Sequence, residues 1–267
     1  MIYGFLGLGN MASAILKGMV ESGNFTNDVL LGFDVDGGKI AAAQAAFSLS
    51  PASSEADVAA RADVLLLAVK PQTLPQALPL VAAALRPGTV VATIAAGKDL
   101  AFYGALLPAG TPVVRLMPNI NAKVKAATVA VCPNEHVTPD GLEAVCAMFR
   151  AIGSVIPLPE ENFPIFSAVA GSSIAFVYLY IAALINACTS AGLTGEQARK
   201  IAASSVLGSA QLVLSCEEDP RDLARQVCSP GGTTIEGVAV MQKHGFEQTV
   251  REAIDAIVRK DEILRRG

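Results

Sequence analysis

A run of small and hydroxylated residues, CSPGGTTIEG at positions 228–237, stands just before a segment with helical character. Thr233 and Glu236 are three residues apart, which is the spacing of a capping box and predicts Thr233 as the N-cap of that helix. Thr234 would then take the first helical position, with its hydroxyl free to face a ligand. The N-terminus of a helix binds carboxylate or phosphate through its free backbone N–H groups and its dipole.

The residues ahead of this helix allow two interpretations. Ser229, Gly231 and Gly232 would line the approach to an anion held at the helix end. Alternatively, the Pro-Gly-Gly sequence is an ordinary turn between two helices, which is the commoner role of such residues. The stretch by itself leaves both interpretations open.

A second glycine-rich stretch, near the N-terminus, has the pattern of a dinucleotide-binding loop. Gly7-x-Gly9-x-x-Ala12 follows an expected strand and opens an amphipathic helix. In such loops the first glycine makes the tight turn, the second leaves room for a pyrophosphate, and the third small residue lets the helix pack on the strand. We therefore predict that a dinucleotide binds at Gly7, Leu8, Gly9, Asn10 and Met11.

Asp34, which ends the second expected strand, fits the acidic position of the same fingerprint. Its carboxylate would accept a hydrogen bond from a ribose 2′-hydroxyl and repel a 2′-phosphate, which favours NAD over NADP. The alternative is a solvated loop acid, with Asp36 or Lys39 shaping the pocket instead.

The next strong strand signal ends in LLLAVKPQ, residues 65–72. Lys70 and Pro71 would lie at the carboxyl end of a central strand, where ligands bind in open α/β sheets. The alternative is a lysine that ends a strand before a proline turn. The residues expected to contact the cofactor here are Ala68, Val69, Lys70 and Pro71.

The composition excludes several classes of function. Hydrophobic residues make up 52% of the 267 residues and charged residues 16%, the net charge is −4, and Lys and Arg form no cluster. Such a chain has little with which to bind nucleic acid or an anionic membrane, and its apolar content indicates subunit contacts. Five cysteines without CxxC spacing indicate reduced cytoplasmic thiols, and with only two histidines no metal centre is expected.

An uncharged run from Asn162 to Gly195 is long enough to cross a bilayer. Polar residues are spread through it, among them Ser167, Asn186 and Thr189. We therefore expect a helix buried between subunits rather than a membrane span.

The order of strand and helix patterns predicts the fold. Short apolar strands alternate with alanine-rich helices up to about residue 160, which indicates βαβ units and a parallel sheet, whereas only helices follow. We expect strands at 2–6, 29–33, 64–69, 89–94, 113–117, 128–132 and 155–158. We expect helices at 11–20, 38–46, 74–85, 139–152, 165–191, 194–215, from 220, and at 246–264. The fold class is thus α/β, with a Rossmann-type, mostly parallel sheet domain over residues 1–160 followed by an all-helical dimerisation domain over 161–267.

The scarcity of residues suited to acid–base catalysis limits the reactions that this chain could catalyse. A nicotinamide enzyme that acts on alcohols or ketones usually needs His or Lys for the proton of the oxygen. No lysine occurs between Lys125 and Lys200, and His136 and His244 lie in unpromising positions. An imine is easier to reduce because its nitrogen can arrive already protonated. A hydroxyl that orients the nitrogen, together with a site for an anion, would suffice.

The chain resembles the pyrroline-5-carboxylate reductase family over nearly its whole length. The resemblance lies in GLGNMA at 7–12, DVLLLAVKP at 63–71, AAG at 95–97, VRLMPN at 114–119, AGL at 191–193 and, most specifically, SPGGTTIEG at 229–237. It implies that hydride passes from NADH or NADPH to the imine carbon of 1-pyrroline-5-carboxylate, giving L-proline. It also implies a homodimer, or a ring of dimers, with interlocked helical domains.

The same resemblance assigns the site residues. It implies that Thr234 is the catalytic residue and hydrogen-bonds the ring nitrogen of the cyclic imino acid. The residues that would hold the substrate carboxylate are Ser229, Gly231, Gly232 and Thr233. The residues that would flank the nicotinamide are Ala95, Ala96, Gly97, Met117, Pro118 and Asn119.

Two stretches depart from the family pattern. The family usually reads Gly-Ser-Gly-Pro-Ala-Tyr where this chain has GSSIAF at 171–176, and Thr-Pro where it has Ile120-Asn121. Two alternatives therefore stay open: a reductase of another cyclic imino acid, such as a six-membered ring, or a dinucleotide-binding regulatory paralogue with weakened catalysis. A β-hydroxyacid dehydrogenase is disfavoured, because the lysine that such enzymes use after a glycine-rich helix start has no counterpart here.

Overall fold

The computed structural model describes residues 1–266 of the chain, with side chains through residue 263. The chain divides into two compact units. The first comprises Met1–Gly171 and the end of the chain from Asp261, and the second comprises Ser172–Lys260.

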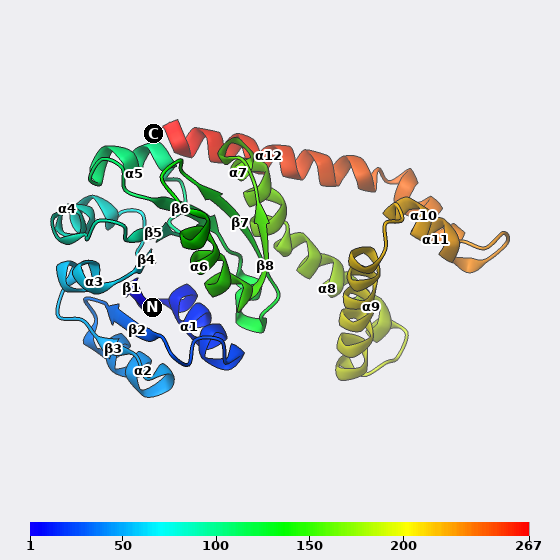
Figure 1. Ribbon diagram of the computed structural model, residues 1–267. Helices are drawn as coiled ribbons and strands as arrows, with labels where there is room; N and C mark the ends of the chain where they lie inside the picture. The colour runs from blue at the N-terminus through cyan, green and yellow to red at the C-terminus, as the bar shows by residue number, and fades with distance from the viewer. Residues whose placement is uncertain (267) are drawn as a thin grey trace. The chain divides into compact units, whose positions relative to one another are not determined.

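The first unit is built on one eight-stranded sheet (Figure 1). The strand order is β3-β2-β1-β4-β5-β6-β7-β8, and all pairs in it are parallel except the antiparallel pair β6–β7. The strands are β1 (Ile2–Leu6), β2 (Val29–Phe33), β3 (Ser50–Pro51), β4 (Val64–Leu67), β5 (Val90–Thr93), β6 (Val113–Met117), β7 (Ala127–Pro133) and β8 (Gly153–Pro157). The predicted mostly parallel sheet is confirmed.

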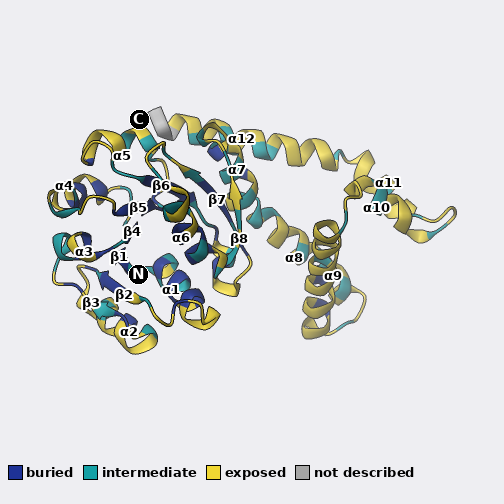
Figure 2. Cartoon of the chain, in the orientation of Figure 1, coloured by how far each residue is buried: buried dark blue, intermediate teal, exposed yellow. Residues whose placement is uncertain are grey.

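Helices cover both faces of this sheet, and an apolar core lies under each set. The helices over the first core are α1 (Asn10–Ser22), α2 (Gly37–Phe47) and α6 (Pro139–Arg150). The helices over the second core are α3 (Glu55–Arg61), α4 (Leu74–Ala84) and α5 (Leu100–Leu106). Successive residues of β4 alternate between the cores, Leu66 in the first and Leu67 in the second. This is why β4 is apolar and buried throughout, and why the central strands of the sheet are dark blue in Figure 2.

Several short elements of the first unit are missing from the sequence-based prediction, among them β3, α3, α5 and the 3₁₀ helix η1 (Ile120–Val124). Helices α3 and α5 have seven residues each, too few to show a clear helical period. The sequence signal that could have revealed these two helices is the N-cap residue at the start of each. Ser54 accepts a hydrogen bond from the Asp57 N–H at the start of α3, and Asp99 accepts one from the Phe102 N–H at the start of α5.

The segment after β8 is helical but irregular. A 3₁₀ turn, η2 (Glu160–Asn162), leads into α7 (Phe163–Phe166), then into a π-helical turn, η3 (Ser167–Ser172), and then into α8 (Ile174–Ser190). The helix expected over 165–191 is present, but a π-helical turn interrupts it at Ser167–Ser172. A stretch that is apolar on all sides gives no periodic signal by which an inserted residue could be detected.

This same stretch, Glu160–Ser190, is the one helix among the described residues that is long and apolar enough to cross a membrane, with a mean hydropathy of 2.0. Only 6% of its most apolar window is buried inside the chain. Length and composition by themselves do not separate a membrane span from a helix that another subunit covers.

The second unit is entirely helical. After α8 it contains α9 (Gly195–Ser215), α10 (Pro220–Val227), α11 (Thr233–Lys243) and most of α12 (Phe246–Arg266). At the start of α9, Thr194 and Gln197 form a capping box.

Much of the apolar surface of the second unit is open. Leu179 of α8 is 70% exposed, and Leu207 and Leu214 of α9 are 60% and 88% exposed. Figure 2 shows these helices as mostly exposed. Exposed apolar side chains in this number indicate a surface that contacts another molecule.

Candidate active site

The loop between β1 and α1 has the backbone that the glycine pattern requires. Gly7 has φ +96°, and its N–H donates to the Phe33 carbonyl at 2.8 Å. A Cβ at Gly7 would lie 2.8 Å from the Ala68 carbonyl oxygen, so the loop passes directly against the end of β4. A Cβ at Gly9, by contrast, would meet nothing within 4 Å. The open space therefore lies at Gly9, where a pyrophosphate would approach the backbone.

The first turn of α1 begins immediately after Gly9, which is its N-cap. Gly9 provides no side-chain cap, and the first turn carries no acidic residue. Asn10 and Met11 form this turn, and the Met11 side chain packs against the first core. The helix end therefore keeps its N–H groups and positive potential for an anion, which fits the phosphates of a dinucleotide.

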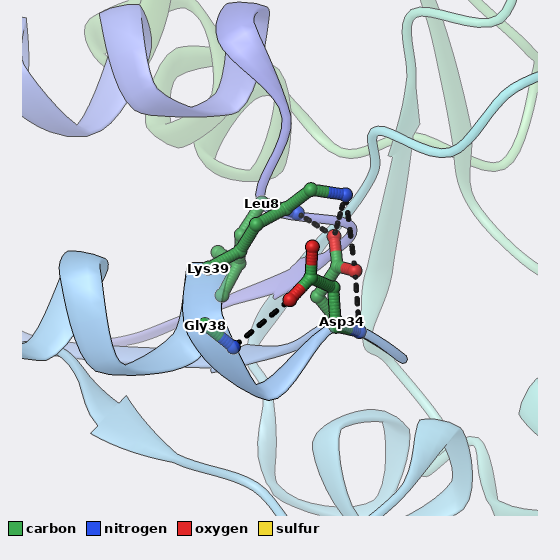
Figure 3. A network of polar contacts seen from close by, with 5 residues as sticks. Leu8, Asp34, Gly38 and Lys39 are labelled. Carbon is green, nitrogen blue, oxygen red and sulfur yellow. Dashed lines mark hydrogen bonds and ion pairs between the residues drawn. The ribbon is translucent and has the colours of Figure 1, made fainter.

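Asp34, at the end of β2, is 9% exposed and makes several polar contacts (Figure 3). Its carboxylate accepts hydrogen bonds from the Leu8 N–H at 2.8 Å and the Asp36 N–H at 2.9 Å. The Lys39 ammonium lies 3.3 and 3.4 Å from its two oxygens. Asp34 is thus buried beside the loop rather than a solvated loop acid, and Lys39 does shape the same pocket.

These contacts decide the charge of Asp34. Burial alone would raise the pKa of its carboxyl. The N–H groups of Leu8 and Asp36 and the Lys39 ammonium outweigh burial, so the pKa is lowered. The carboxylate is therefore ionised at neutral pH.

A cavity of about 240 Å³ brings this part of the predicted site together. The predicted residues that line it are Gly7, Gly9, Asp34, Ala68, Val69 and Lys70. Glu55, Thr73 and Lys39 line it as well, and the first two were not foreseen. Two further predicted residues adjoin the lining of this cavity. The Leu8 N–H donates to the Asp34 carboxylate, and Pro71 follows Lys70 in the turn before α4.

The remaining predicted cofactor residues follow the next two strands. Ala95–Gly97 comes after β5, with Gly97 at φ +74°, and Pro118 and Asn119 come after Met117, the last residue of β6. Since β2, β1, β4, β5 and β6 are consecutive and parallel, all the loops after them open at one edge of the sheet. Ligands of open α/β sheets bind at this edge.

The proposed carboxylate site lies in the second unit, at the start of α11. Here one prediction is wrong: Thr233 is not the N-cap but the first residue of the helix, Gly232 is the N-cap, and no side chain caps this end. The reason is the preceding turn, in which the Gly232 N–H donates to the Ser229 carbonyl at 3.0 Å and Gly231 has φ +71°. Because this turn ends at Gly232, the helix begins one residue earlier in the sequence than predicted, at Thr233.

The chemistry of this helix end is retained. In the part of the chain that the structure describes, no hydrogen bond is recorded for the hydroxyls of Thr233 and Thr234, which are both exposed. The Ser229 side chain lies close against the N-cap residue: a Cβ at Gly232 would lie 2.4 Å from the Ser229 Oγ. The first turn of α11 thus presents uncapped N–H groups together with the hydroxyls of Thr233 and Thr234, as an anion site needs.

No metal centre accompanies these sites in residues 1–266 as described. Among those residues, no group of three or more His, Cys, Asp and Glu side chains lies close enough to hold a metal ion. The five cysteines are free thiols.

Two partly buried polar contacts next to the predicted loops were not foreseen from the sequence. The Asn119 amide donates to the Ala170 carbonyl at 2.9 Å, and Glu160 pairs with Arg115, 2.7 Å apart. A charged residue inside the apolar strand VVRLM signals that a partner must exist, although the sequence does not identify it.

The fold and the first unit together define a class: an oxidoreductase with a dinucleotide-binding domain and a helical C-terminal region. Residues 2–97 match the family model described as NADP oxidoreductase, coenzyme F420-dependent, and residues 160–264 match that of pyrroline-5-carboxylate reductase dimerisation. The chain is 37% identical to a pyrroline-5-carboxylate reductase of Escherichia coli, covering 99% of this chain and 98% of that one. It belongs to the pyrroline-5-carboxylate reductase family.

Other relatives agree. A pyrroline-5-carboxylate reductase of Synechocystis is 36% identical over 98% of this chain and 97% of its own length. The solved pyrroline-5-carboxylate reductase of Coxiella burnetii superposes with a TM-score of 0.90 at 28% identity, covering 98% of this chain and 97% of that one. That of Plasmodium falciparum, solved with NADP bound, has a TM-score of 0.83 at 25% identity, covering 99% and 98%. The predicted family, fold class and oxidoreductase activity are confirmed.

Proposed function

We propose that this chain reduces 1-pyrroline-5-carboxylate to L-proline with a reduced nicotinamide dinucleotide. The observation that carries the proposal is the near full-length identity of 37% to the Escherichia coli pyrroline-5-carboxylate reductase. The predicted loops at one edge of the sheet and the uncapped end of α11 supply the two binding sites that such a reaction needs.

The cofactor site follows from the loops at the edge of the first unit. The end of α1 and Gly9 would hold the pyrophosphate, and Asp34 the adenosine ribose. The loops Ala95–Gly97 and Met117–Asn119 would flank the nicotinamide. When bound, the reduced nicotinamide supplies the hydride that adds to the imine carbon.

Asp34 and Lys39 bear on the choice between the two cofactors. An ionised Asp34 would accept from a ribose 2′-hydroxyl and repel a 2′-phosphate, which favours NADH. The Lys39 ammonium, whose side chain is 46% exposed, would attract a 2′-phosphate at the same place. We therefore propose that both cofactors bind, with NADH favoured.

The substrate site is proposed at α11. The free N–H groups at the helix end, with Ser229, Gly231, Gly232 and Thr233, would bind the carboxylate of the cyclic imine. The Thr234 hydroxyl oxygen would accept a hydrogen bond from the protonated ring nitrogen. Since this nitrogen arrives with its proton, no side chain has to supply one, which fits the absence of His and Lys from the stretch 228–237.

The helical region is proposed to form a homo-oligomer. The match of residues 160–264 to a dimerisation family and the exposed apolar side chains of α8 and α9 support this. We place the domain boundary at 160/161, the uncharged helix in a subunit interface rather than a membrane, and the enzyme in the cytoplasm, with no metal and no nucleic acid bound.

Turnover by the purified protein tests the proposal. The oxidation of NADH and of NADPH is followed with 1-pyrroline-5-carboxylate as substrate, and L-proline is measured as the product. Cofactor oxidation that requires the imine and yields an equal amount of proline supports the proposal. No oxidation of either cofactor, at a protein concentration that binds them, would leave only a cofactor-binding role.

A second candidate is a reductase of a six-membered cyclic imino acid. The sequence GSSIAF at 171–176 motivates it, because the family usually has glycine and proline at the third and fourth of these positions. Comparison of kcat/KM on the five- and six-membered rings decides between the two substrates.

A further inference from the structure

Both polar atoms of the Asn119 side chain make hydrogen bonds within the protein. Asn119 is 6% exposed, and its Oδ1 accepts from the Asn121 N–H at 3.2 Å and the Thr128 N–H at 3.4 Å. Its Nδ2 donates to the Ala170 carbonyl at 2.9 Å. An asparagine that directly follows Met117 and Pro118 thus points its amide into the protein rather than offering it to a ligand.

The acceptor of the Asn119 amide lies in an unusual element. Ala170 belongs to the π turn Ser167–Ser172, at the boundary of the helical region. A backbone carbonyl has two lone pairs, so it can accept the Asn119 amide in addition to any bond along the helix. Short π-helical turns occur frequently at functional sites, and this one is held by a residue of a predicted cofactor loop.

A second contact ties the other nicotinamide loop to the same segment. The Glu160 Oε1 atom accepts from the Leu100 N–H at 2.8 Å and pairs with Arg115 at 2.7 Å. Leu100 starts α5, shortly after the loop Ala95–Gly97. Both loops proposed to flank the nicotinamide are therefore hydrogen-bonded, directly or within a few residues, to the segment 160–170.

We propose that Asn119 is a positioning residue that sets the backbone at 117–121 against the π turn and thereby fixes the nicotinamide for hydride transfer. This rests on the proposed reductase function. Asn119 acts through the loop and does not touch the cofactor with its side chain. Its loss should slow hydride transfer while the rest of the dinucleotide stays bound at Gly9 and Asp34, because small errors in the placement of reacting atoms are costly.

The test compares two asparagines with the same bonding pattern. Asn134 also donates to a backbone carbonyl, that of Thr111 at 3.0 Å, and its Oδ1 accepts from the Val113 N–H at 3.0 Å. It lies at the opposite edge of the sheet, where β6 begins. Asn119→Asp and Asn134→Asp each replace one amide donor by a carboxylate and keep an acceptor, so they match in chemistry and differ in place, with Asn134 the less buried of the two.

The measurements are kcat, KM for the imine, and the Kd for NADH of each variant. Asn119→Asp should lower kcat about tenfold or more, with Kd changed by less than about threefold. Asn134→Asp should leave kcat within about twofold of the wild type. Equal kcat values for both variants would overturn the proposal, whereas an inactive wild type would instead overturn the reductase function.

Hydrogen exchange of the wild-type protein keeps the proposal testable if Asn119→Asp does not fold. Binding of NAD⁺ should slow amide exchange in Ser167–Ser172 as well as in the loops that follow β5 and β6. Cofactor binding that protects the loops and leaves the π turn unchanged would overturn the proposal, and this readout requires no turnover.

Discussion

Arg115 and Glu160 form an ion pair in the first unit, with 2.7 Å between the guanidinium Nη1 and the carboxylate Oε1. The Arg115 side chain is 2% exposed, and its guanidinium lies 4.4 Å from the centre of the Phe163 ring. The pair thus joins β6 to the segment of η2 and α7. This contact explains why an apolar strand carries an arginine.

Removal of Glu160 should destabilise the first unit. Glu160→Ala leaves the buried guanidinium of Arg115 without its charged partner, which costs about 2–3 kcal/mol for a pair that is partly exposed on the glutamate side. Urea unfolding of the variant and the wild type measures the difference.

An exposed ion pair provides the control for this prediction. Glu143 pairs with Arg150 at 2.6 Å on the surface of α6, so Glu143→Ala should leave stability nearly unchanged. Equal stability losses in the two variants would mean that burial of Arg115 does not matter.

The two glycines of the first loop should fail in different ways. Gly7→Val introduces a Cβ next to the Ala68 carbonyl at a positive φ, so it should lower the melting temperature. Gly9→Val has room in the protein and should fold normally, but its side chain would fill the space of the pyrophosphate. Calorimetric titration with NADH checks the second effect: normal affinity in Gly9→Val would show that the cofactor does not approach Gly9.

Local sequence patterns predicted the first unit well because they are physical requirements of the chain itself. The loop at Gly7 and Gly9 needs residues without side chains, and apolar strands such as β4 need burial on both faces. Asp34 was recognised for the same reason, since it lies at a fixed place after β2. Its Lys39 partner was foreseen only as an alternative.

Other features could not be predicted from the sequence. They depend on contacts between distant residues, or on which of two neighbouring residues becomes the N-cap of a helix. The bond from Asn119 to Ala170 joins residues 51 positions apart, and only the fold brings them together. At α11 both Gly232 and Thr233 are acceptable N-caps, and the turn at Ser229 decides for the glycine.

Asp34 and Lys39 should have opposite effects on cofactor choice. Asp34→Ser removes the repulsion of a 2′-phosphate and should raise the ratio of kcat/KM for NADPH over NADH roughly tenfold. Lys39→Ala removes the attraction and should lower the same ratio by a similar factor. Ratios that shift in the same direction in both variants would contradict the roles assigned to this ion pair.

The hydroxyl of Thr234 should matter for turnover and little for stability, because it is exposed at the start of α11 and no protein group in the described residues is recorded as its partner. Thr234→Val keeps the shape of the side chain and should lower kcat/KM on the imine by about 10- to 1,000-fold, through loss of the bond to the ring nitrogen. Thr234→Ser keeps the hydroxyl and should retain most of the activity. If the valine and serine variants are equally active, the hydroxyl does not bind the substrate, and the role of α11 reduces to its backbone N–H groups.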